Sequence, residues 1–179
     1  MREVDRRTKI DRRKFLSTAA AAPAVVVAAT AGLSIDGAWA ANAQALKPET
    51  MKTLAVIARD IYPHDHLADQ YYITAVTPWD TKAASNPKVR ALVEQGVALL
   101  NELALARYKS PYAAFAWEEQ RVTLLHEIEQ SEFFGKVRGD LLVSLYNNHE
   151  VWPKFGYEGS SAEHGGYINR GFNDIDWLS

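Results

Sequence analysis

The amino-acid sequence predicts an all-α fold: a small helical bundle of about five helices followed by an irregular, aromatic-rich C-terminal tail. Three observations support this fold class. Apolar residues recur at helical spacing between residues 48 and 145. Prolines and small polar residues stand where these helices are expected to begin. No stretch of four or more residues shows the alternating, β-branched pattern that is typical of strands.

The composition is that of one globular domain, with 179 residues, of which 47% are hydrophobic and 23% charged. The formal net charge of -2 argues against a nucleic-acid-binding protein, because such proteins usually carry a strong positive excess. The count of Cys 0 excludes disulfides, thiolate metal sites, iron–sulfur clusters and covalently attached haem. We therefore expect no cofactor in this chain, and any redox role would need a cofactor held by another protein.

Residues 1–40 are predicted to be a twin-arginine signal peptide, which directs a protein to the periplasm. Arg12 and Arg13 form the arginine pair, and Phe15 and Leu16 begin an uncharged apolar run that extends to residue 33. This export route carries proteins that are already folded, as a protein with a cofactor inserted in the cytoplasm must be. The mature chain shows no cofactor motif of its own. Its signal is therefore of a kind for which the chain itself shows no need.

Small residues at 38 and 40, and again at 41 and 43, predict cleavage of the signal after Ala40 or Ala43. The alternative is a transmembrane anchor, since about 20 apolar residues can span a bilayer. Alanine contributes little to insertion, however, and Pro23 interrupts the run. A cleaved signal is the favoured interpretation.

The first predicted helix runs from Pro48 to about Ile61. Pro48 suits the first helical position, and Glu49 places a negative charge in the first turn, where it interacts favourably with the helix dipole. Pro63 disfavours helical backbone at Tyr62, the residue before it. The helix is therefore expected to end there.

Two further helices are predicted before residue 109. A short one extends from Leu67 to Val76, with Asp65 as its cap and Pro78 at its end. A long amphipathic helix follows the cap and first-turn proline of residues 85–87, and a break at 109–111 ends it. The expected buried side of the long helix consists of Val89, Leu92, Val93, Leu99, Leu100 and Leu103.

Two more helices complete a helical domain at residues 41–145. The first extends from Trp117 to Glu129, and the second begins at Ser131. His126 lies among apolar residues and is expected to be a partly buried, hydrogen-bonded histidine. The expected buried side chains are Arg121, Val122, Leu125 and Ile128 in the first helix, and Phe133, Phe134, Val137, Leu141, Leu142 and Leu145 in the second.

Residues 146–179 form the predicted tail, in which glycines interrupt any helix and aromatic residues require burial. Such a segment either wraps across its own helices or contacts another protein, because interface cores are enriched in the same residue types. The residues by themselves leave both possibilities open. The aromatic residues of the tail are Tyr146, Trp152, Phe155, Tyr157, Tyr167, Phe172 and Trp177.

The best local candidate for a metal site is His64, Asp65 and His66, with Asp60 and Asp69 nearby in the sequence. Nothing in the sequence brings a third ligand close to them. The simpler interpretation is that Asp65 caps a helix and His64 hydrogen-bonds in a turn. We therefore assign no metal ligand. The other histidines are His126, His149 and His164.

The usual motifs of catalysis do not occur in this sequence. It has no Gly-x-Gly-x-x-Gly dinucleotide motif, no phosphate loop, no Gly-x-Ser-x-Gly nucleophile elbow and no cysteine nucleophile. Glutamates recur in the second half of the chain but are best explained as solvated helix faces. We therefore assign no catalytic residue. These acids are Glu118, Glu119, Glu127, Glu129 and Glu132.

Four segments of the tail resemble the C-terminal signature of the gluconate 2-dehydrogenase subunit 3 family. The loop YPHD at 62–65 and the twin-arginine signal are also similar to that family, and the resemblance covers about residues 45–179. The four segments are LYNNHEVW at 145–152, GYEG at 156–159, GGYINRGF at 165–172 and DIDWL at 174–178.

The resemblance implies a non-catalytic small subunit of a periplasmic, membrane-linked, FAD-dependent sugar or glycoside dehydrogenase. The large catalytic subunit of such a complex carries FAD in a glucose–methanol–choline oxidoreductase fold, and a cytochrome c subunit with haem c often accepts the electrons. The small subunit supplies the signal read by the twin-arginine translocase, and it stabilises the large subunit or helps it mature. This explains why a chain without a cofactor has a signal for folded cargo.

The tail is the predicted binding surface for the large subunit, and Arg170 has a local alternative in Asp174 or Asp176. Two other functions stay open at this point. One is a periplasmic metal-dependent enzyme that uses His64 and its two neighbours, and the other is a stand-alone structural helical protein whose tail closes its own core. The predicted partner-binding residues are Trp152, Tyr157, Tyr167, Arg170, Phe172 and Trp177.

Overall fold

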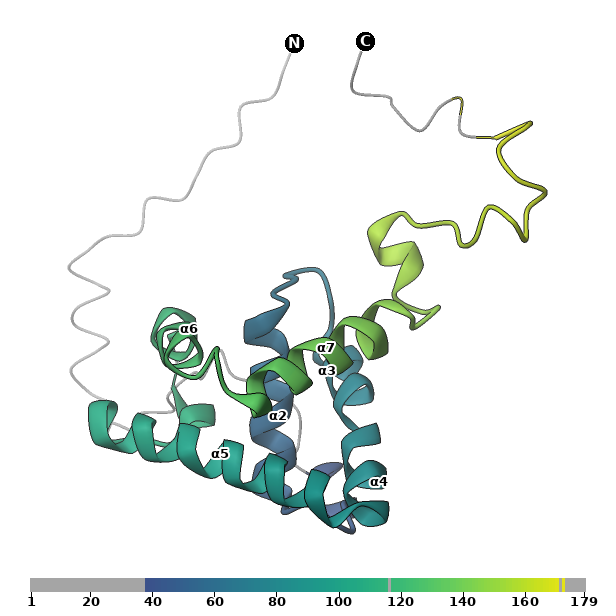
Figure 1. Ribbon diagram of the computed structural model, residues 1–179. Helices are drawn as coiled ribbons and strands as arrows, with labels where there is room; N and C mark the ends of the chain where they lie inside the picture. The colour runs from purple at the N-terminus through teal and green to yellow at the C-terminus, as the bar shows by residue number, and fades with distance from the viewer. Residues whose placement is uncertain (1–37, 116, 171, 173–179) are drawn as a thin grey trace, which may run out of the picture.

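The structure is a computed structural model that describes residues 38–115, 117–170 and 172 (Figure 1). The predicted signal residues Arg12, Arg13, Phe15 and Leu16, and the predicted partner-binding residue Trp177, lie outside the described residues. Within the described part of the chain the secondary structure is helical and contains no strand, which confirms the all-α prediction.

The five predicted helices are all present. The α-helices are α2 (Pro48–Ile61), α3 (Asp69–Val76), α4 (Pro78–Ser85), α5 (Pro87–Tyr108), α6 (Glu118–Glu127) and α7 (Glu132–Tyr146). Three 3-10 turns accompany them, η1 (Ala40–Asn42), η2 (Tyr112–Ala114) and η3 (Trp152–Phe155).

Helix α4 was not predicted. Pro78 does follow the end of α3, as expected, but it also occupies the first position of α4. A proline is well suited to that position because the first amide of a helix has no intrahelical partner and the ring fixes a helical φ. Thr77 keeps a helical conformation between the two helices, with φ -53° and ψ -39°.

Two local caps behave as the sequence predicts, and one does not. The Asn86 side chain accepts the amides of Lys88 and Val89 at the start of α5, and Ser131 accepts the amide of Phe134 at the start of α7. Asp65, by contrast, caps nothing: α3 begins after Ala68, which makes no side-chain cap. The prediction for Asp65 was wrong because the loop makes its own turn, in which the amide of residue 67 donates to the carbonyl of residue 64.

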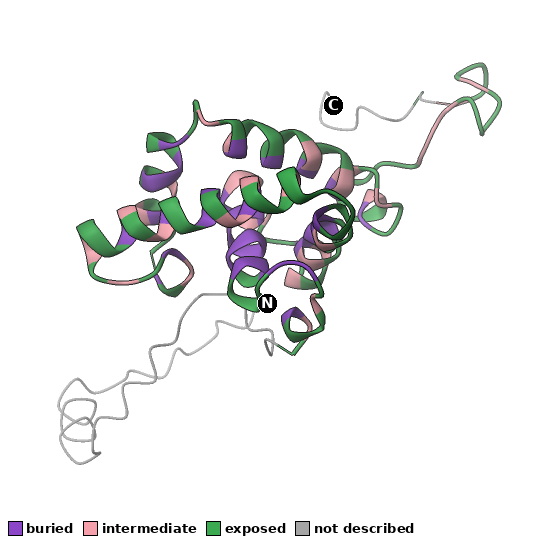
Figure 2. Ribbon diagram, turned by 60° about the horizontal axis from the view of Figure 1, so that its bottom comes forward, coloured by how far each residue is buried: buried purple, intermediate pink, exposed green. Residues whose placement is uncertain are grey.

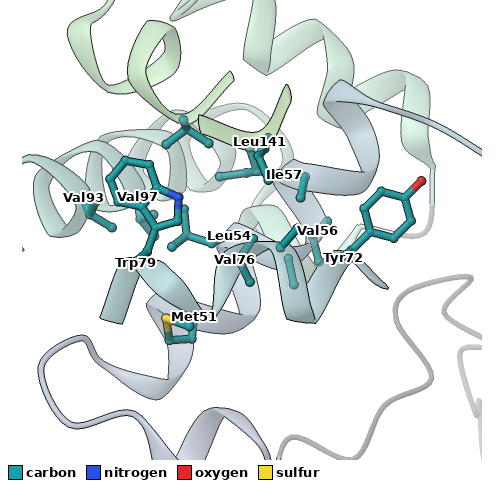
Figure 3. Close-up of a cluster of buried hydrophobic side chains, with 14 of the residues drawn as sticks. Met51, Leu54, Val56, Ile57, Tyr72, Val76, Trp79, Val93, Val97 and Leu141 are labelled. Carbon is teal, nitrogen blue, oxygen red and sulfur yellow. The ribbon is translucent and has the colours of Figure 1, made fainter. Parts of the chain in front are cut away.

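Helix α2 is the central element of the bundle and contacts α3, α5, α6 and α7 (Figure 1). Its alanines let the neighbouring helices approach closely, and its larger side chains fill the space between them. Trp79 from α4 and Leu141 from α7 complete the same cluster (Figure 3). The buried hydrophobic residues of α2 are Met51, Leu54, Ala55, Val56, Ile57 and Ala58.

The buried sides of α5 and α7 differ in part from the predicted ones. In α5 the buried stripe passes through Val93, Val97, Leu100 and Ala104, and Leu99 lies beside it with 46% of its surface exposed. In α7 the buried residues recur at every fourth position, so that Leu142 is turned outward and is 53% exposed. Leu99 and Leu142 were therefore wrongly predicted to be buried. Apolar character alone does not show which of two overlapping helical stripes will face the core.

His126 was also wrongly predicted. It lies on the outer side of α6 with its side chain 72% exposed, and its Nδ1 is 3.2 Å from Oε2 of Glu129. The neighbouring Leu124 and Leu125 enter the core instead. The apolar neighbours of His126 in the sequence did not indicate on which side of the helix its imidazole would lie.

A buried ion pair joins the end of α2 to α6. Arg121 binds Asp60 in a bidentate manner, with Nε to Oδ2 at 2.7 Å and Nη2 to Oδ1 at 2.8 Å. The hydroxyl of Tyr112 donates to the same carboxylate at 2.6 Å, and Nη1 of Arg121 donates to the carbonyl of Phe115 at 2.6 Å. Burial, and then the charge of Asp60, raise the pKa of Tyr112, so its hydroxyl stays protonated and continues to donate.

The N-terminal strap, residues 39–47, lies against α2, α4 and α5. Four consecutive backbone amides of the strap donate to two carboxylates. Asp80 on α4 accepts the amides of residues 44, 45 and 46 at 2.8–2.9 Å, and Glu94 on α5 accepts the amide of Lys47 at 2.8 Å. Glu94 also accepts the hydroxyl of Thr50 at 2.9 Å. The start of α2 is thus held by acids from other helices and not by a local cap.

Helices α5 and α7 meet where Gly96 faces the ring of Phe133. A Cβ atom at Gly96 would lie 2.1 Å from Cγ of that ring, so any larger residue would displace α7 or the ring. Gly139 on the outer side of α7 has nothing within 4 Å of the same added atom. The two glycines therefore form a matched pair for substitution.

We predict that Gly96→Ala destabilises the protein by about 1–3 kcal/mol, because the added methyl overpacks a buried contact. Gly139→Ala should instead stabilise it by about 0.5–1 kcal/mol, since alanine is the better residue in an open helix position. Urea unfolding followed by circular dichroism measures both. Equal effects of the two substitutions would contradict the packing described here.

We also predict that Arg121→Ala destabilises the protein by about 3–5 kcal/mol, because it leaves the Asp60 carboxylate buried without a cation. Arg107, which pairs with Glu127 on the surface, provides the control. Arg107→Ala should leave the unfolding midpoint near that of the wild type, since water solvates both groups. A similar midpoint for the two variants would show that the buried pair does not hold α6 in place.

Candidate functional site

The tail leaves the helical body at the end of α7 and extends away from it (Figures 1 and 2). Its first part is anchored. Val151 is completely buried in the core, and the indole Nε1 of Trp152 donates to the carbonyl of Tyr146 at 2.7 Å. Gly156 then ends η3 in a left-handed conformation, with φ 70°, that favours glycine. The core is closed before the aromatic residues that follow.

An aromatic junction, composed of His64, His66, Tyr146 and Phe155, joins the loop after α2 to the base of the tail. Nε2 of His64 and the hydroxyl of Tyr146 form a hydrogen bond of 2.7 Å. The ring of Phe155 lies 4.8 Å from that of His64 and 5.2 Å from that of His66, between centroids. These distances are typical of edge-to-face aromatic contacts. The structure thus brings together the loop after α2 and the base of the tail, which lie 82 residues apart at His64 and Tyr146.

The His64 imidazole is held in its neutral form. Burial, and then repulsion from the neighbouring His66, lower the pKa of His64. Its backbone amide donates to the hydroxyl of Tyr72 at 3.1 Å, and that hydroxyl donates to the carbonyl of Tyr62 at 2.7 Å. The side chain of His64 therefore hydrogen-bonds to α7 and not, as the simpler interpretation of the sequence predicts, within its own turn, while its backbone amide binds in the loop.

The described residues place no third ligand near His64 and His66, and they contain no group of three or more His, Cys, Asp or Glu residues arranged to hold a metal ion. The remaining histidines make other contacts. His149 is stacked on Trp152 at 3.9 Å between centroids, and Nε2 of His164 lies 3.2 Å from the carbonyl of Glu158. The metal-dependent enzyme has no supporting geometry in this part of the chain.

Among the described residues beyond Gly156, the aromatic side chains are exposed. The exposed fractions are 50% for Tyr157, 68% for Tyr167 and 78% for Phe172, and Ile168 reaches 82%. Trp152 differs from them, because it is half-buried against His149 and meets Tyr157 edge-on at 5.1 Å. Of the predicted partner-binding residues that the structure describes, the tyrosines and Phe172 are therefore available for contact, whereas Trp152 supports the base of the tail.

Arg170 makes an ion pair with Glu158 within the tail. Its predicted local partners, Asp174 and Asp176, lie outside the described residues. A hollow of about 220 Å³ lies beside this pair, bordered also by Tyr157, Tyr167 and tail glycines. This is smaller than typical pockets for small molecules, so the arrangement shapes the tail and does not indicate a substrate site.

A second exposed apolar surface lies on α7 and was missed in the sequence. Gly135, Gly139, Leu142 and Val143 are separated by helical spacings and lie on the outer side of that helix. Leu142 and Val143 are 53% and 63% exposed, and the glycines leave the backbone bare between them. The spacing of the two glycines was visible in the sequence, but Leu142 had been placed on the buried side.

A hollow of about 560 Å³ lies between the end of α2, α6 and α7, with Leu125 and Phe134 among its apolar lining residues. Glu118, His126 and Glu129 also line it. The hydrogen bond from His126 lowers the pKa of Glu129, which keeps this exposed acid ionised and unsuited to proton transfer near neutral pH. The hollow therefore contains apolar walls and solvated charges rather than a recognisable acid–base pair.

Comparison of the chain with protein-family models, curated proteins and solved structures gave no match. The resemblance to the gluconate 2-dehydrogenase subunit 3 family thus depends on the tail segments, the 62–65 loop and the arginine pair described above.

None of the helices in the described residues has both the length and the hydrophobicity required to cross a bilayer. The apolar run at 15–33 lies outside these residues.

We predict that acid weakens the aromatic junction. Because folding lowers the pKa of His64 below its ordinary value of 6.5, the unfolded chain binds the proton more readily. The stability due to neutral His64 is complete above about pH 6.5 and is lost as the pH falls through the folded value. Amide exchange at Tyr157, whose amide donates to the Trp152 carbonyl, should accelerate at pH 5 relative to pH 7.5 after correction for intrinsic rates.

His64→Gln keeps a hydrogen-bonding group but does not titrate, and it should remove this pH dependence. His126→Gln replaces an exposed histidine outside the junction and should retain it. The same pH dependence in all three proteins would show that His64 does not control the base of the tail.

Proposed function

We propose that this chain is the non-catalytic small subunit of a periplasmic FAD-dependent sugar or glycoside dehydrogenase. In this proposal it provides the twin-arginine export signal for the catalytic large subunit and stabilises that subunit or helps it mature. FAD belongs to the large subunit, and haem c to a cytochrome c subunit where one is present. The observation that supports it best is the exposure of Tyr167, Ile168 and Phe172 on a tail that leaves the helices.

The exposed tail favours a partner over a role in closing the core. Leu141, Leu145 and Val151 are fully buried, and among the described residues the hydrophobic core includes none after Val151. Large apolar side chains that remain in water after the core is complete are typical of protein–protein contacts. Tyrosine and phenylalanine rings of this kind supply much of the binding energy at interface centres.

The outer surface of α7 supports the same proposal. The surface formed by Gly135, Gly139, Leu142 and Val143 continues through Tyr146 into the tail, since α7 ends at Tyr146. Nothing lies within 4 Å of a Cβ atom added at Gly135 or Gly139. A partner backbone can therefore approach the helix closely at these glycines. We infer that a large subunit would cover this surface and the tail together.

The proposal predicts that the tagged chain, purified from its native host, brings with it a flavin-containing oxidoreductase that lacks its own signal peptide. Tyr167→Ala combined with Phe172→Ala should reduce recovery of that protein at least about tenfold, since interface aromatics often contribute 1–2 kcal/mol or more each. Flavin absorbance and intact-mass measurement of the eluate quantify the recovery.

Trp117→Ala is the matched control, because Trp117 is 72% exposed but precedes α6 and lies far from the tail in the sequence. It should leave recovery unchanged. Gly139→Trp, which leaves the tail intact, should reduce recovery by blocking the α7 surface. Failure to recover a flavoprotein with the wild-type chain, or equal recovery with all variants, would refute the proposed function.

A further inference from the structure

The N-terminal strap, residues 39–47, is part of the folded body. Ala40 is completely buried, and Ala45 and Leu46 are 8% and 3% exposed. The 3-10 turn η1, which contains Ala40, contacts α2, and Trp39 packs partly buried against the core. Removal of Ala40 would thus take a side chain out of the packed interior.

The backbone amides of the strap are hydrogen-bonded from residue 42 to residue 47, although Ala41, Asn42, Gln44 and Lys47 are exposed. The amides of Gln44, Ala45 and Leu46 all donate to the Asp80 carboxylate, at 2.8, 2.9 and 2.8 Å. Hydrogen bonds from backbone amides to a charged acceptor are stronger than those between neutral groups. Burial alone would raise the pKa of Asp80, but these three hydrogen bonds outweigh it and lower the pKa. The carboxylate that holds the strap is therefore ionised at neutral pH.

The expected cleavage sites of the signal peptide lie within this strap, after Ala40 and after Ala43. A protease needs several residues of accessible backbone, which in a folded protein usually come from exposed loop tips or from local opening. Here the amide of Ala43 donates to the carbonyl of Ala40 at 3.2 Å in η1, and the amides of the next residues are bound to Asp80. Ala43 itself has an extended backbone, with φ -62° and ψ 137°. The amides from residue 42 to residue 47 are nevertheless all hydrogen-bonded, so neither site is free in the folded chain.

We propose that the strap is a latch, held closed by Asp80, that conceals these two cleavage sites in the folded chain. Processing there then proceeds only while the strap is detached from α4. The inference rests on the proposed export function in one respect: a chain exported in the folded state would keep its signal until the latch opens. The latch itself is a property of the isolated chain and needs no partner.

The test is proteolysis of the purified full chain by pancreatic elastase, which accepts small residues such as alanine in its specificity pocket. Cuts at residues 40–45 are followed over time by intact-mass spectrometry, with a synthetic peptide of residues 38–47 as the fully open reference. We expect the wild-type chain to be cut at least about tenfold more slowly than the peptide. The Asp80→Ala variant should be cut at a rate close to that of the peptide, because the substitution removes the acceptor of three amides.

Asp140→Ala is the control for loss of an acid that contacts α4, because Asp140 pairs with Lys82 on that helix and does not touch the strap. It should behave as the wild type does. Asp80→Asn, which keeps one carbonyl oxygen, should give an intermediate rate. Urea unfolding followed by circular dichroism reports whether each variant retains its helical core.

Amide exchange of residues 44–46 in the wild-type chain tests the latch without any substitution. Protected amides support it, and exchange at the rate of the open peptide would overturn it. The latch would also be overturned if elastase cut the wild-type chain as fast as the Asp80→Ala variant, provided that this variant retains its core. Failure to recover a flavoprotein refutes the proposed function alone, whereas rapid elastase cleavage of the folded chain refutes the latch alone.

Discussion

The buried ion pair between Asp60 and Arg121 is the interaction on which the arrangement of the helices depends. Both side chains are almost fully shielded from water, so each charge requires the other and the added hydrogen bonds of Tyr112 and the Phe115 carbonyl. This network fixes the end of α2, the turn η2 and the start of α6 relative to one another. Apolar contacts tolerate small shifts between helices, but a bidentate pair without solvent does not, because any displacement would leave a charge unpaired in the interior.

A second constraint acts at the other end of α2. Glu94 and Asp80 accept the backbone amides that lead into this helix, and both acids come from other helices. A helix start usually needs a polar side chain close by in the sequence, because its first amides have no intrahelical acceptors. No side chain caps the first amides of α2; the acids of α4 and α5 instead bind the four amides before the helix, so the strap is bound only when α4 and α5 are in place. Folding of the body and concealment of the strap are then one event.

The surface proposed to bind a partner lies on the outer side of α7 and on the tail. Helix α2 is enclosed by its neighbours, while α7 is packed on one side and open on the other. The tail continues from that open helix, and the aromatic junction of His64 with Tyr146 and Phe155 determines where it departs. Tyr157, Tyr167 and Phe172, the described aromatic residues beyond Gly156, have exposed rings. A body that satisfies its own core and presents rings on an extension is well suited to binding another protein.

The sequence alone determined the local features of this protein: the helical class, the five predicted helices, the starts at Pro48 and Pro87, and the caps at Asn86 and Ser131. Each of these depends on residues within one turn of the chain. The sequence also showed that the tail is rich in aromatic residues, but it left open whether they pack on the helices or face outward. Only the tertiary structure decided that Asp60 pairs with Arg121, 61 residues away, and that the strap is closed by acids of other helices. It also decided which of two apolar stripes on α7 enters the core. These outcomes depend on how whole helices pack, since burial and charge pairing across long separations arise only when distant segments share the same interior.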